Sequence, residues 1–229
     1  MDKISAIIVA AGSGNRMETR LPKQFLKIAG QTILYRTLSV FGNNQNIAEI
    51  ILVIAADYLK SEELQNSIPD QLKNRVKITQ GGKSRQESVQ NGLKQLDNEA
   101  KIVLVHDGVR PFVTNQIIAE NVEECRNKGA VLTAIPVTDT LKLVDDGYVQ
   151  ETLDRNKIWR AQTPQTFKVS ILQECFEKAK DEGIAATDEA RIVEKYYKVY
   201  PIKGHKNNFK ITHKEDLLRA RALIKELQK

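Results

Sequence analysis

Cysteine is scarce in this 229-residue chain, which has only Cys125 and Cys175. Two cysteines so far apart match neither a disulfide framework nor the ligand spacing of a zinc site, so we expect buried thiols in a reducing compartment. Long apolar runs are also missing, and the sequence opens without the basic and apolar regions of a secretory signal. These absences predict a cytoplasmic protein with no membrane partner.

The chain also has only a moderate excess of positive charge and no internal repeats. The net charge is +6, from 35 Lys and Arg against 29 Asp and Glu, and the basic residues are mixed with acidic ones. Without a basic cluster interleaved with aromatic side chains, we expect no nucleic-acid partner, whereas a small polyanionic substrate suits this charge balance. No repeat, low-complexity tract or linker divides the sequence, so residues 1–229 are predicted to form one domain.

Apolar, β-branched runs alternate with segments of helical periodicity. This rhythm predicts an α/β fold, in which a mostly parallel sheet is flanked by helical crossovers. The predicted strands are 4–9, 50–55, 76–79, 102–105 and 131–135, and the predicted helices are 32–41, 84–96, 115–127, 169–180 and 213–227. In the last helix, Thr212 is expected to cap the amino end, with Glu215 reaching back to it.

The segment 140–154 departs from this rhythm, because apolar and polar residues alternate on both sides of Asp146-Gly147. An Asp-Gly pair between two alternating runs is a strong signal for a β-hairpin. A hairpin has no natural place inside a parallel sheet, so residues 138–156 are predicted to project as an arm. Such an arm would cover the site or reach a second subunit, and it favours a homodimer.

A glycine loop at residues 10–17 ends the first predicted strand and is the most informative feature present. Gly12 and Gly14 lie in this loop, and two cations, Arg16 and Lys23, lie in or just after it. Glycines let backbone N–H groups approach a ligand closely, and the cations supply the charge that phosphate needs when it leaves water. The loop therefore predicts a cradle for a nucleoside triphosphate.

Two better-known glycine motifs do not fit this loop. A dinucleotide-binding fingerprint needs a third glycine, where this chain has Met17, and an acidic residue about 20 positions on, near Leu34. A P-loop needs four residues between its glycines, whereas one residue separates Gly12 from Gly14. An ordinary strand-to-helix turn stays open when the loop is taken alone.

A second glycine loop and an aspartate follow two later strands. Gly81 and Gly82 come after the third predicted strand and precede Ser88, while Asp107 and Arg110 follow the fourth. Because ligands of parallel sheets bind outside the carboxyl ends of the strands, these groups are expected to surround one ligand. The second loop could read a base edge, and Asp107 is the best-placed candidate to bind a divalent cation beside phosphate.

Simpler interpretations of these residues stay open. The second loop could be a plain turn before a helix that begins with a serine, and Asp107 could be a cap at a strand end. His106 is more often a satisfied core histidine than a ligand or base. From chemistry alone, residues 187–190 could be only a helix start.

Taken together, the spaced motifs resemble those of the 2-C-methyl-D-erythritol 4-phosphate cytidylyltransferases, from residue 10 to about residue 217. The matching elements are the two glycine loops, Pro22-Lys23-Gln24, 105–111, 136–142, 162–165, 187–190 and Lys210-Ile211-Thr212. The resemblance implies a Rossmann-like nucleotidyltransferase with an arm that pairs two subunits. It also implies CTP, Mg²⁺ and a sugar-alcohol phosphate as partners, in the synthesis of isoprenoid precursors.

The resemblance also implies a role for each matching residue. Arg16 and Lys23 would be catalytic, and Asp107 would bind the metal. CTP would be bound by Ala10, Ala11, Gly12, Gly14, Gly82, Arg85, Ser88, Asp107 and Gly108. The acceptor would be bound by Thr140, Arg155, Thr163, Lys210 and Arg110. Since Thr140 and Arg155 flank the hairpin, each site is expected to borrow residues from its neighbour.

The acceptor sugar has an alternative. Residues 109–112 resemble the D-ribitol 5-phosphate cytidylyltransferases, Gly108 stands where the methylerythritol enzymes often have Ala, and Phe209 stands where Ile is usual. The first loop, Ser88 and residues 136–142 favour methylerythritol phosphate. A non-catalytic CTP-binding sensor is the alternative from another class, and it predicts binding without release of pyrophosphate.

Overall fold

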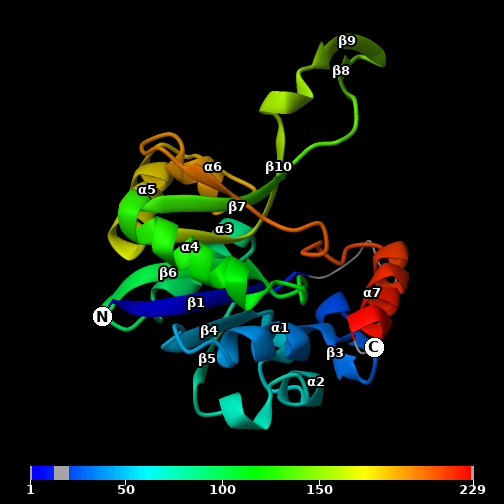
Figure 1. Cartoon of the computed structure of the whole chain (residues 1–229). Coiled ribbons are helices and arrows are strands. Elements are labelled where there is room, and N and C mark those ends of the chain that lie inside the picture. The colour runs from blue at the N-terminus through cyan, green and yellow to red at the C-terminus, as the bar shows by residue number, and fades with distance from the viewer. Residues whose placement is uncertain (1, 13–20, 228–229) are drawn as a thin grey trace.

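The computed structural model describes residues 2–12 and 21–227. At its centre lies a seven-stranded sheet in the order β11-β7-β10-β6-β1-β4-β5 (Figure 1). β10 is antiparallel to both of its neighbours, and the other pairings in the sheet are parallel. The strands of the sheet are β1 (Lys3–Ala10), β4 (Glu49–Ile54), β5 (Val76–Gln80), β6 (Ala100–Asp107), β7 (Ala130–Pro136), β10 (Trp159–Lys168) and β11 (Tyr200–Lys203).

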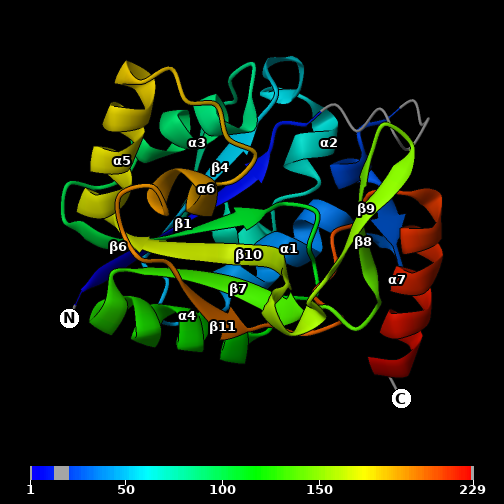
Figure 2. The same ribbon diagram turned by 90° about the horizontal axis from the view of Figure 1, so that it is seen from above.

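Helices cover both faces of this sheet (Figures 1 and 2). The helices are α1 (Ile33–Gly42), α2 (Glu62–Gln65), α3 (Arg85–Leu93), α4 (Asn115–Lys128), α5 (Val169–Asp181), α6 (Glu189–Val193) and α7 (Lys214–Leu227). Ile8 of β1 joins the apolar cluster with α1 and α4, whereas Ile7 joins the cluster with α3, α5 and α6. Successive side chains of a strand point to opposite faces, so a strand covered on both sides is apolar throughout. The predicted fold class is confirmed.

The five predicted strands and five predicted helices are present, with ends that differ by two residues or less in every case but one. The exception is α3, which ends at Leu93 instead of residue 96. Thr32 and Ser84 lie just before α1 and α3, where their side chains accept backbone hydrogen bonds from the first turns.

The sequence does not predict β10 and β11. β10 contains Pro164, and a proline inside a run argues against a central strand. The pairing of β10 with β7 is irregular between Ala161 and Gln165, so Pro164 lies where the ladder is interrupted. The strand also buries polar side chains that find distant partners, such as Thr166, whose Oγ1 donates to Asn121 Oδ1 at 2.9 Å. β11 is short and mostly exposed.

The hairpin is present as β8 (Leu141–Asp145) and β9 (Tyr148–Leu153). Asp146 and Gly147 in its turn have φ angles of 48° and 80°. Positive φ at both central residues gives the tight turn that matches the twist of paired strands. The hairpin stands away from the body of the molecule (Figure 1), which confirms the predicted arm.

The amino end of α7 differs from the prediction. Asp216, not Glu215, reaches back, and its Oδ2 accepts from the backbone N–H groups of Thr212 at 2.8 Å and His213 at 2.9 Å. The helix begins at Lys214, so Asp216 is its third residue, the position from which a side chain can bond back to the preceding backbone. α7 also packs against Ile28 of the short strand β2 (Lys27–Ile28), which pairs with β3 (Gln31–Thr32).

Short 3-10 helices complete the chain at Lys23–Phe25, Ala56–Tyr58, Asp70–Leu72 and Arg155–Lys157. Across the described residues, none of the helices has the length and apolar character needed to span a bilayer.

Candidate active site

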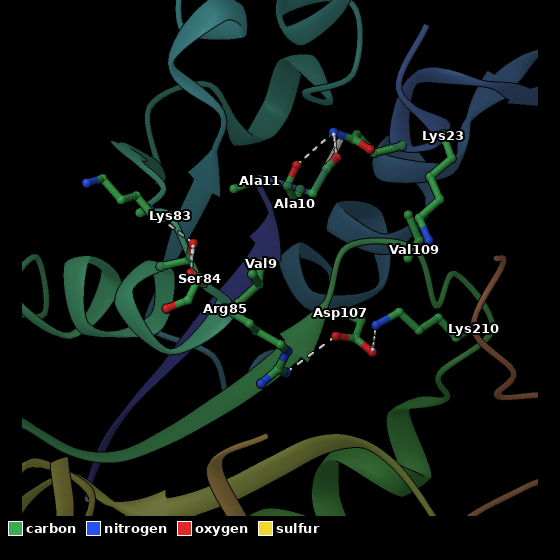
Figure 3. Close-up of a pocket in the computed structure, with 14 residues that line it drawn as sticks. Val9, Ala10, Ala11, Lys23, Lys83, Ser84, Arg85, Asp107, Val109 and Lys210 are labelled. Atoms are coloured by element: carbon green, nitrogen blue, oxygen red, sulfur yellow. Dashed lines mark hydrogen bonds and ion pairs between the residues drawn. The ribbon is translucent and has the colours of Figure 1, made fainter. Parts of the chain in front are cut away.

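A cavity of about 550 Å³ lies at the carboxyl ends of β1 and β6 and is also lined by the loop before α3 (Figure 3). In the sheet β1 lies between β6 and β4, so the chain continues to one side of β1 first and to the other side later. Where strand order reverses in this way, a crevice forms outside the strand ends, and α/β proteins bind ligands there.

The first glycine loop is tied to the segment that carries Lys23. The buried Gln24 side chain donates from Nε2 to Ala10 O at 2.8 Å and to Gly12 O at 3.3 Å. These bonds hold the start of the loop against the short helix Lys23–Phe25, so the loop and Lys23 line the same cavity. The predicted residues Gly14 and Arg16 lie outside the described residues.

The second glycine loop packs against the first. A Cβ on Gly81 would lie 2.3 Å from the Ala11 Cβ, so glycine is what lets the loops approach this closely. Gly82 N donates to Ser88 Oγ at 3.1 Å, and the Ser88 hydroxyl donates to Ser84 O at 2.8 Å. The Ser88 proton is therefore used inside the loop, and a role for Ser88 in reading a base stays a prediction.

Asp107, at the end of β6, is buried among three cationic side chains. Its Oδ2 lies 3.0 Å from Arg110 Nε and 3.2 Å from Lys210 Nζ, and its Oδ1 lies 3.3 Å from Arg85 Nη2. Arg85 and Lys210 approach the carboxylate from opposite sides (Figure 3). Burial alone would raise the pKa of Asp107, but the three cations hold it well below its usual range. The carboxylate is therefore ionised at neutral pH.

Behind Asp107 lies a neutral histidine. Thr163 Oγ1 accepts from the Asp107 N–H at 3.1 Å and lies 3.0 Å from His106 Nδ1, so its hydroxyl donates to that nitrogen. His106 Nε2 then carries the ring proton and donates to Arg110 O at 3.1 Å. Burial lowers the pKa of His106 to about 4. His106 is thus a satisfied core residue and supplies neither acid nor base at neutral pH.

Lys210 reaches the cavity from the segment before α7, which is fastened to the end of β6 and to β10. Ile211 N donates to Val109 O at 2.9 Å. Arg110 Nη1 donates to Asn208 O at 3.0 Å, and Asn208 Nδ2 donates to Thr163 O at 2.9 Å. This buried backbone and amide network sets the position of Lys210.

The predicted site residues fall into three groups. Those that line the cavity are Ala10, Ala11, Gly12, Lys23, Gly82, Arg85, Ser88, Asp107 and Lys210. Those in or behind its wall are Gly108, Arg110 and Thr163. Thr140 and Arg155 lie on the exposed arm and do not line this cavity, and Arg155 Nη1 donates to Thr138 O at 3.0 Å.

Five further residues line the cavity that the sequence did not predict: Val9, Gln24, Lys83, Ser84 and Val109. Each lies within three positions of a predicted site residue, so the glycine loops and the end of β6 are the signal that could have found them. Lys83 and Ser84 come from the second loop, on the other side of the cavity from Lys23 and Lys210, and the exposed Lys83 side chain points away from the centre of the cavity (Figure 3).

Asp107 is the one carboxylate among the cavity-lining residues that the structure describes. Within residues 2–12 and 21–227, no three His, Cys, Asp or Glu side chains are grouped so that they could hold a metal by themselves. Mg²⁺ commonly takes only one or two protein carboxylates, together with phosphate oxygens and water. Asp107 therefore suits a cation that binds together with a polyphosphate.

A mostly parallel sheet with two glycine loops and several cations around a cavity at its switch point defines a nucleotide-binding α/β protein. The model of one such family, 2-C-methyl-D-erythritol 4-phosphate cytidylyltransferase, matches residues 4–226, and the chain belongs to this family. A relative of that name from Clostridioides difficile (strain 630) is 44% identical over 217 residues, which cover 93% of this chain and 90% of the relative.

Solved structures agree with this assignment. The 4-diphosphocytidyl-2C-methyl-D-erythritol synthase of Anaerococcus prevotii DSM 20548 superposes with a TM-score of 0.84 at 34% identity, covering 98% of this chain and 96% of that one. The 2-C-methyl-D-erythritol 4-phosphate cytidylyltransferase of Thermus thermophilus gives a TM-score of 0.81 at 32% identity, covering 97% of this chain and 99% of that one.

Proposed function

We propose that the protein transfers the cytidylyl group of CTP to 2-C-methyl-D-erythritol 4-phosphate. The products would be 4-diphosphocytidyl-2-C-methyl-D-erythritol and pyrophosphate, on the route to isoprenoid precursors. One observation carries this proposal: in a chain of the cytidylyltransferase family, two glycine loops and the cations Lys23, Arg85 and Lys210 surround one ionised carboxylate at the strand ends. An excess of cations in a concave site suits a polyphosphate.

The chemistry needs no general base from the protein. A phosphate oxygen of the acceptor attacks the α-phosphorus of CTP, and the bond from that phosphorus to the bridging oxygen breaks, so pyrophosphate leaves with the bonding electrons. A phosphate monoester has a second pKa near 6, so the acceptor is already largely a dianion at neutral pH. The neutral, fully bonded His106 agrees with this. The protein must supply alignment and compensation of negative charge.

The residue roles that we propose are those that the family resemblance implies, and the cavity lining supports them for the residues that the structure describes. Lys23 and Arg16 stabilise the charge that develops on the phosphates of CTP. The nucleotide lies against the two glycine loops, with contacts from Ala10, Ala11, Gly12, Gly14, Gly82, Arg85, Ser88 and Gly108. The acceptor phosphate is bound by Lys210, with Arg110, Thr163, Thr140 and Arg155. Asp107 would hold Mg²⁺, which neutralises phosphate charge when it is bound.

We further propose a homodimer that forms through the arm. Leu143, Val144, Tyr148 and Val149 on its two strands are 49–75% exposed. A lone two-stranded hairpin is marginal in water, and exposed apolar side chains on it call for a covering surface. In a dimer the arm can carry Thr140 and Arg155 to the partner's cavity. The variant V149D should elute as a monomer in size-exclusion chromatography with light scattering, while a wild-type monomer would contradict the proposal.

We also propose that the protein works in the cytoplasm as a single catalytic domain. Both cysteines are free and buried. Burial raises the pKa of Cys125 to about 12 and that of Cys175 to about 11, so neither thiol is poised for redox chemistry. Unreactive free thiols suit a reducing compartment.

Pyrophosphate release with CTP and Mg²⁺ tests the function. We expect turnover with 2-C-methyl-D-erythritol 4-phosphate, none with D-ribitol 5-phosphate, and near-complete loss in K23A. Turnover with ribitol phosphate alone would move the protein to the alternative acceptor that residues 109–112 suggest. CTP binding without pyrophosphate release from either acceptor would favour a nucleotide sensor.

A further inference from the structure

Glu189 is a buried carboxylate that the proposed chemistry does not use. It is 1% exposed, begins α6 and does not line the cavity, yet its Oε1 accepts a hydrogen bond from Arg85 Nη1. The other side of the same guanidinium donates from Nη2 to Asp107 Oδ1 at 3.3 Å. Arg85 is therefore shared between a carboxylate in the cavity and one behind it.

The fold fixes Glu189 through β10. Gln165 Nε2 donates to Asp188 Oδ2 at 2.9 Å, and Gln165 Oε1 accepts from Ala190 N at 2.8 Å. Asp188 in turn caps α6. One glutamine thus fastens the two residues that flank Glu189 to a strand paired with β6, the strand that carries Asp107. The carboxylate has little freedom to move away from Arg85.

Arg85 is the main group that compensates the negative charge of the buried Glu189. Burial raises the pKa of Glu189, and the charge of Arg85 opposes that rise. Glu189 Oε2 has no hydrogen-bond partner within the described part of the chain. Burial of a carboxylate with one unbonded oxygen lowers the stability of the fold, which favours a role for Glu189 beyond packing.

We propose that Glu189 is a positioning residue for cytidylyl transfer, which holds the Arg85 guanidinium in the cavity wall so that Arg85 orients the Asp107 carboxylate. The inference rests on the proposed function. Charge-assisted bonds from a guanidinium are strong and directional, so a fixed Glu189 limits Arg85 to one orientation. Without the charge of Glu189, the Arg85 guanidinium would pair with Asp107 alone and would move from its position in the cavity wall.

The variant E189Q keeps the shape of the side chain and removes its charge. We expect kcat for pyrophosphate release to fall about 10- to 100-fold, the range seen when supporting partners of a site are altered. The KM for the acceptor should change much less, because Lys210 and the arm are untouched. E194Q is the matched control, since Glu194 directly follows the same helix and pairs with Arg191 on the surface. It should retain the wild-type kcat.

A double-mutant cycle separates positioning from simple stabilisation. In an R85Q background, E189Q should cause no further loss of kcat, because the residue through which it acts is gone. R85Q leaves Glu189 buried without its cation, and the double variant removes that unpaired charge, so its Tm should recover relative to R85Q. If E189Q lowers Tm but keeps kcat within twofold of wild type, Glu189 is only a structural partner and the proposal is wrong.

A measurement that needs no turnover keeps the two proposals apart. In nuclear magnetic resonance spectra, the Arg85 guanidinium should give slowly exchanging side-chain signals in wild type and E194Q that disappear in E189Q. Their persistence in E189Q would overturn the positioning role. Absence of pyrophosphate release from the wild-type enzyme would instead refute the proposed function.

Discussion

Replacement of Asp107 by Asn tests whether one carboxylate holds the cationic cavity together. The residue is 5% exposed and contacts Arg85, Arg110 and Lys210. The variant D107N keeps the shape of the side chain and removes its charge, so the three cations lose the carboxylate that they share. Removal of one partner from a buried ion pair costs about 3–5 kcal/mol of stability.

The structure selects the lower end of that range. Arg85 keeps its bond to Glu189, and the Lys210 side chain is 36% exposed, so it can turn toward water. The Arg110 side chain is 12% exposed and keeps the Asn208 carbonyl as a partner. We therefore expect the free energy of unfolding to fall by about 3 kcal/mol. For a chain of this size, such a change lowers Tm by about 6–12 °C.

The dependence on pH gives the prediction a second signature. A carboxyl whose pKa is lower in the folded state contributes stability above its unfolded pKa, about 3.9 for Asp, and loses it as the pH falls toward the folded pKa. The stability difference between wild type and D107N should therefore be constant between about pH 5 and 8 and shrink below about pH 4.

Calorimetry with EDTA and without nucleotide measures this difference. The control is E123Q, because the Glu123 side chain is 65% exposed and its pair with Arg126 lies on the surface. It should lose less than about 1 kcal/mol. A D107N protein that melts together with E123Q at neutral pH would refute the idea that Asp107 compensates the buried cations.

Three further predictions concern the loops and the histidine. A Cβ on Gly81 would lie 2.3 Å from the Ala11 Cβ, whereas one on Gly12 meets no atom of the described residues within 4 Å. G81A should therefore lose about 1–3 kcal/mol in urea unfolding, and G12A should match wild type; equal losses would contradict the loop packing. Q24M removes the donor for the backbone carbonyls of two loop residues. Because an unsatisfied group costs about 1–3 kcal/mol, the variant should bind CTP about tenfold more weakly in titration calorimetry. An unchanged affinity would show that these hydrogen bonds are dispensable. Burial lowers the pKa of His106 to about 4 from about 6.5, so its neutral form contributes stability above pH 6.5 that is lost as the pH falls toward 4. The free energy of unfolding of H106Q should therefore depend less on pH in that range.

The central strands could be predicted because their burial leaves a visible pattern. β4 is buried along its whole length, and after Glu49 its sequence is an unbroken apolar run, Ile50 to Ile54. β10 is buried too, but Gln162, Thr163, Gln165 and Thr166 occupy its core. Such side chains become acceptable only through partners elsewhere in the chain, as when Gln165 bonds Asp188. Local periodicity holds no trace of those partners, so β10 was missed.

The site residues likewise differ in whether a local sequence pattern or a distant partner determines their position. The glycine loops and Asp107 could be predicted because a strand end followed by glycine or a charge is a local pattern. Lys210 was named through the family resemblance, since its approach to Asp107 depends on the bond between Ile211 and Val109. Residues 187–190 were a weak signal for a similar reason: the contact between Glu189 and Arg85 joins positions 104 residues apart.

The three cations can converge only where a negative charge compensates them, and the sequence shows the residue that supplies it, Asp107. Arg85 comes from α3, Arg110 from the turn after β6, and Lys210 from the segment before α7, and all three contact Asp107. Like charges brought this close repel one another by several kcal/mol at an effective dielectric constant of about 20. They can meet in the absence of a ligand because Asp107 compensates them. A polyphosphate would supply the same negative charge from outside, so the folded protein already holds the electrostatic arrangement that such a ligand needs. An isolated acidic residue at a strand end, among motifs rich in glycine and cations, therefore marks where positive charge gathers and is more informative than any one of the cations.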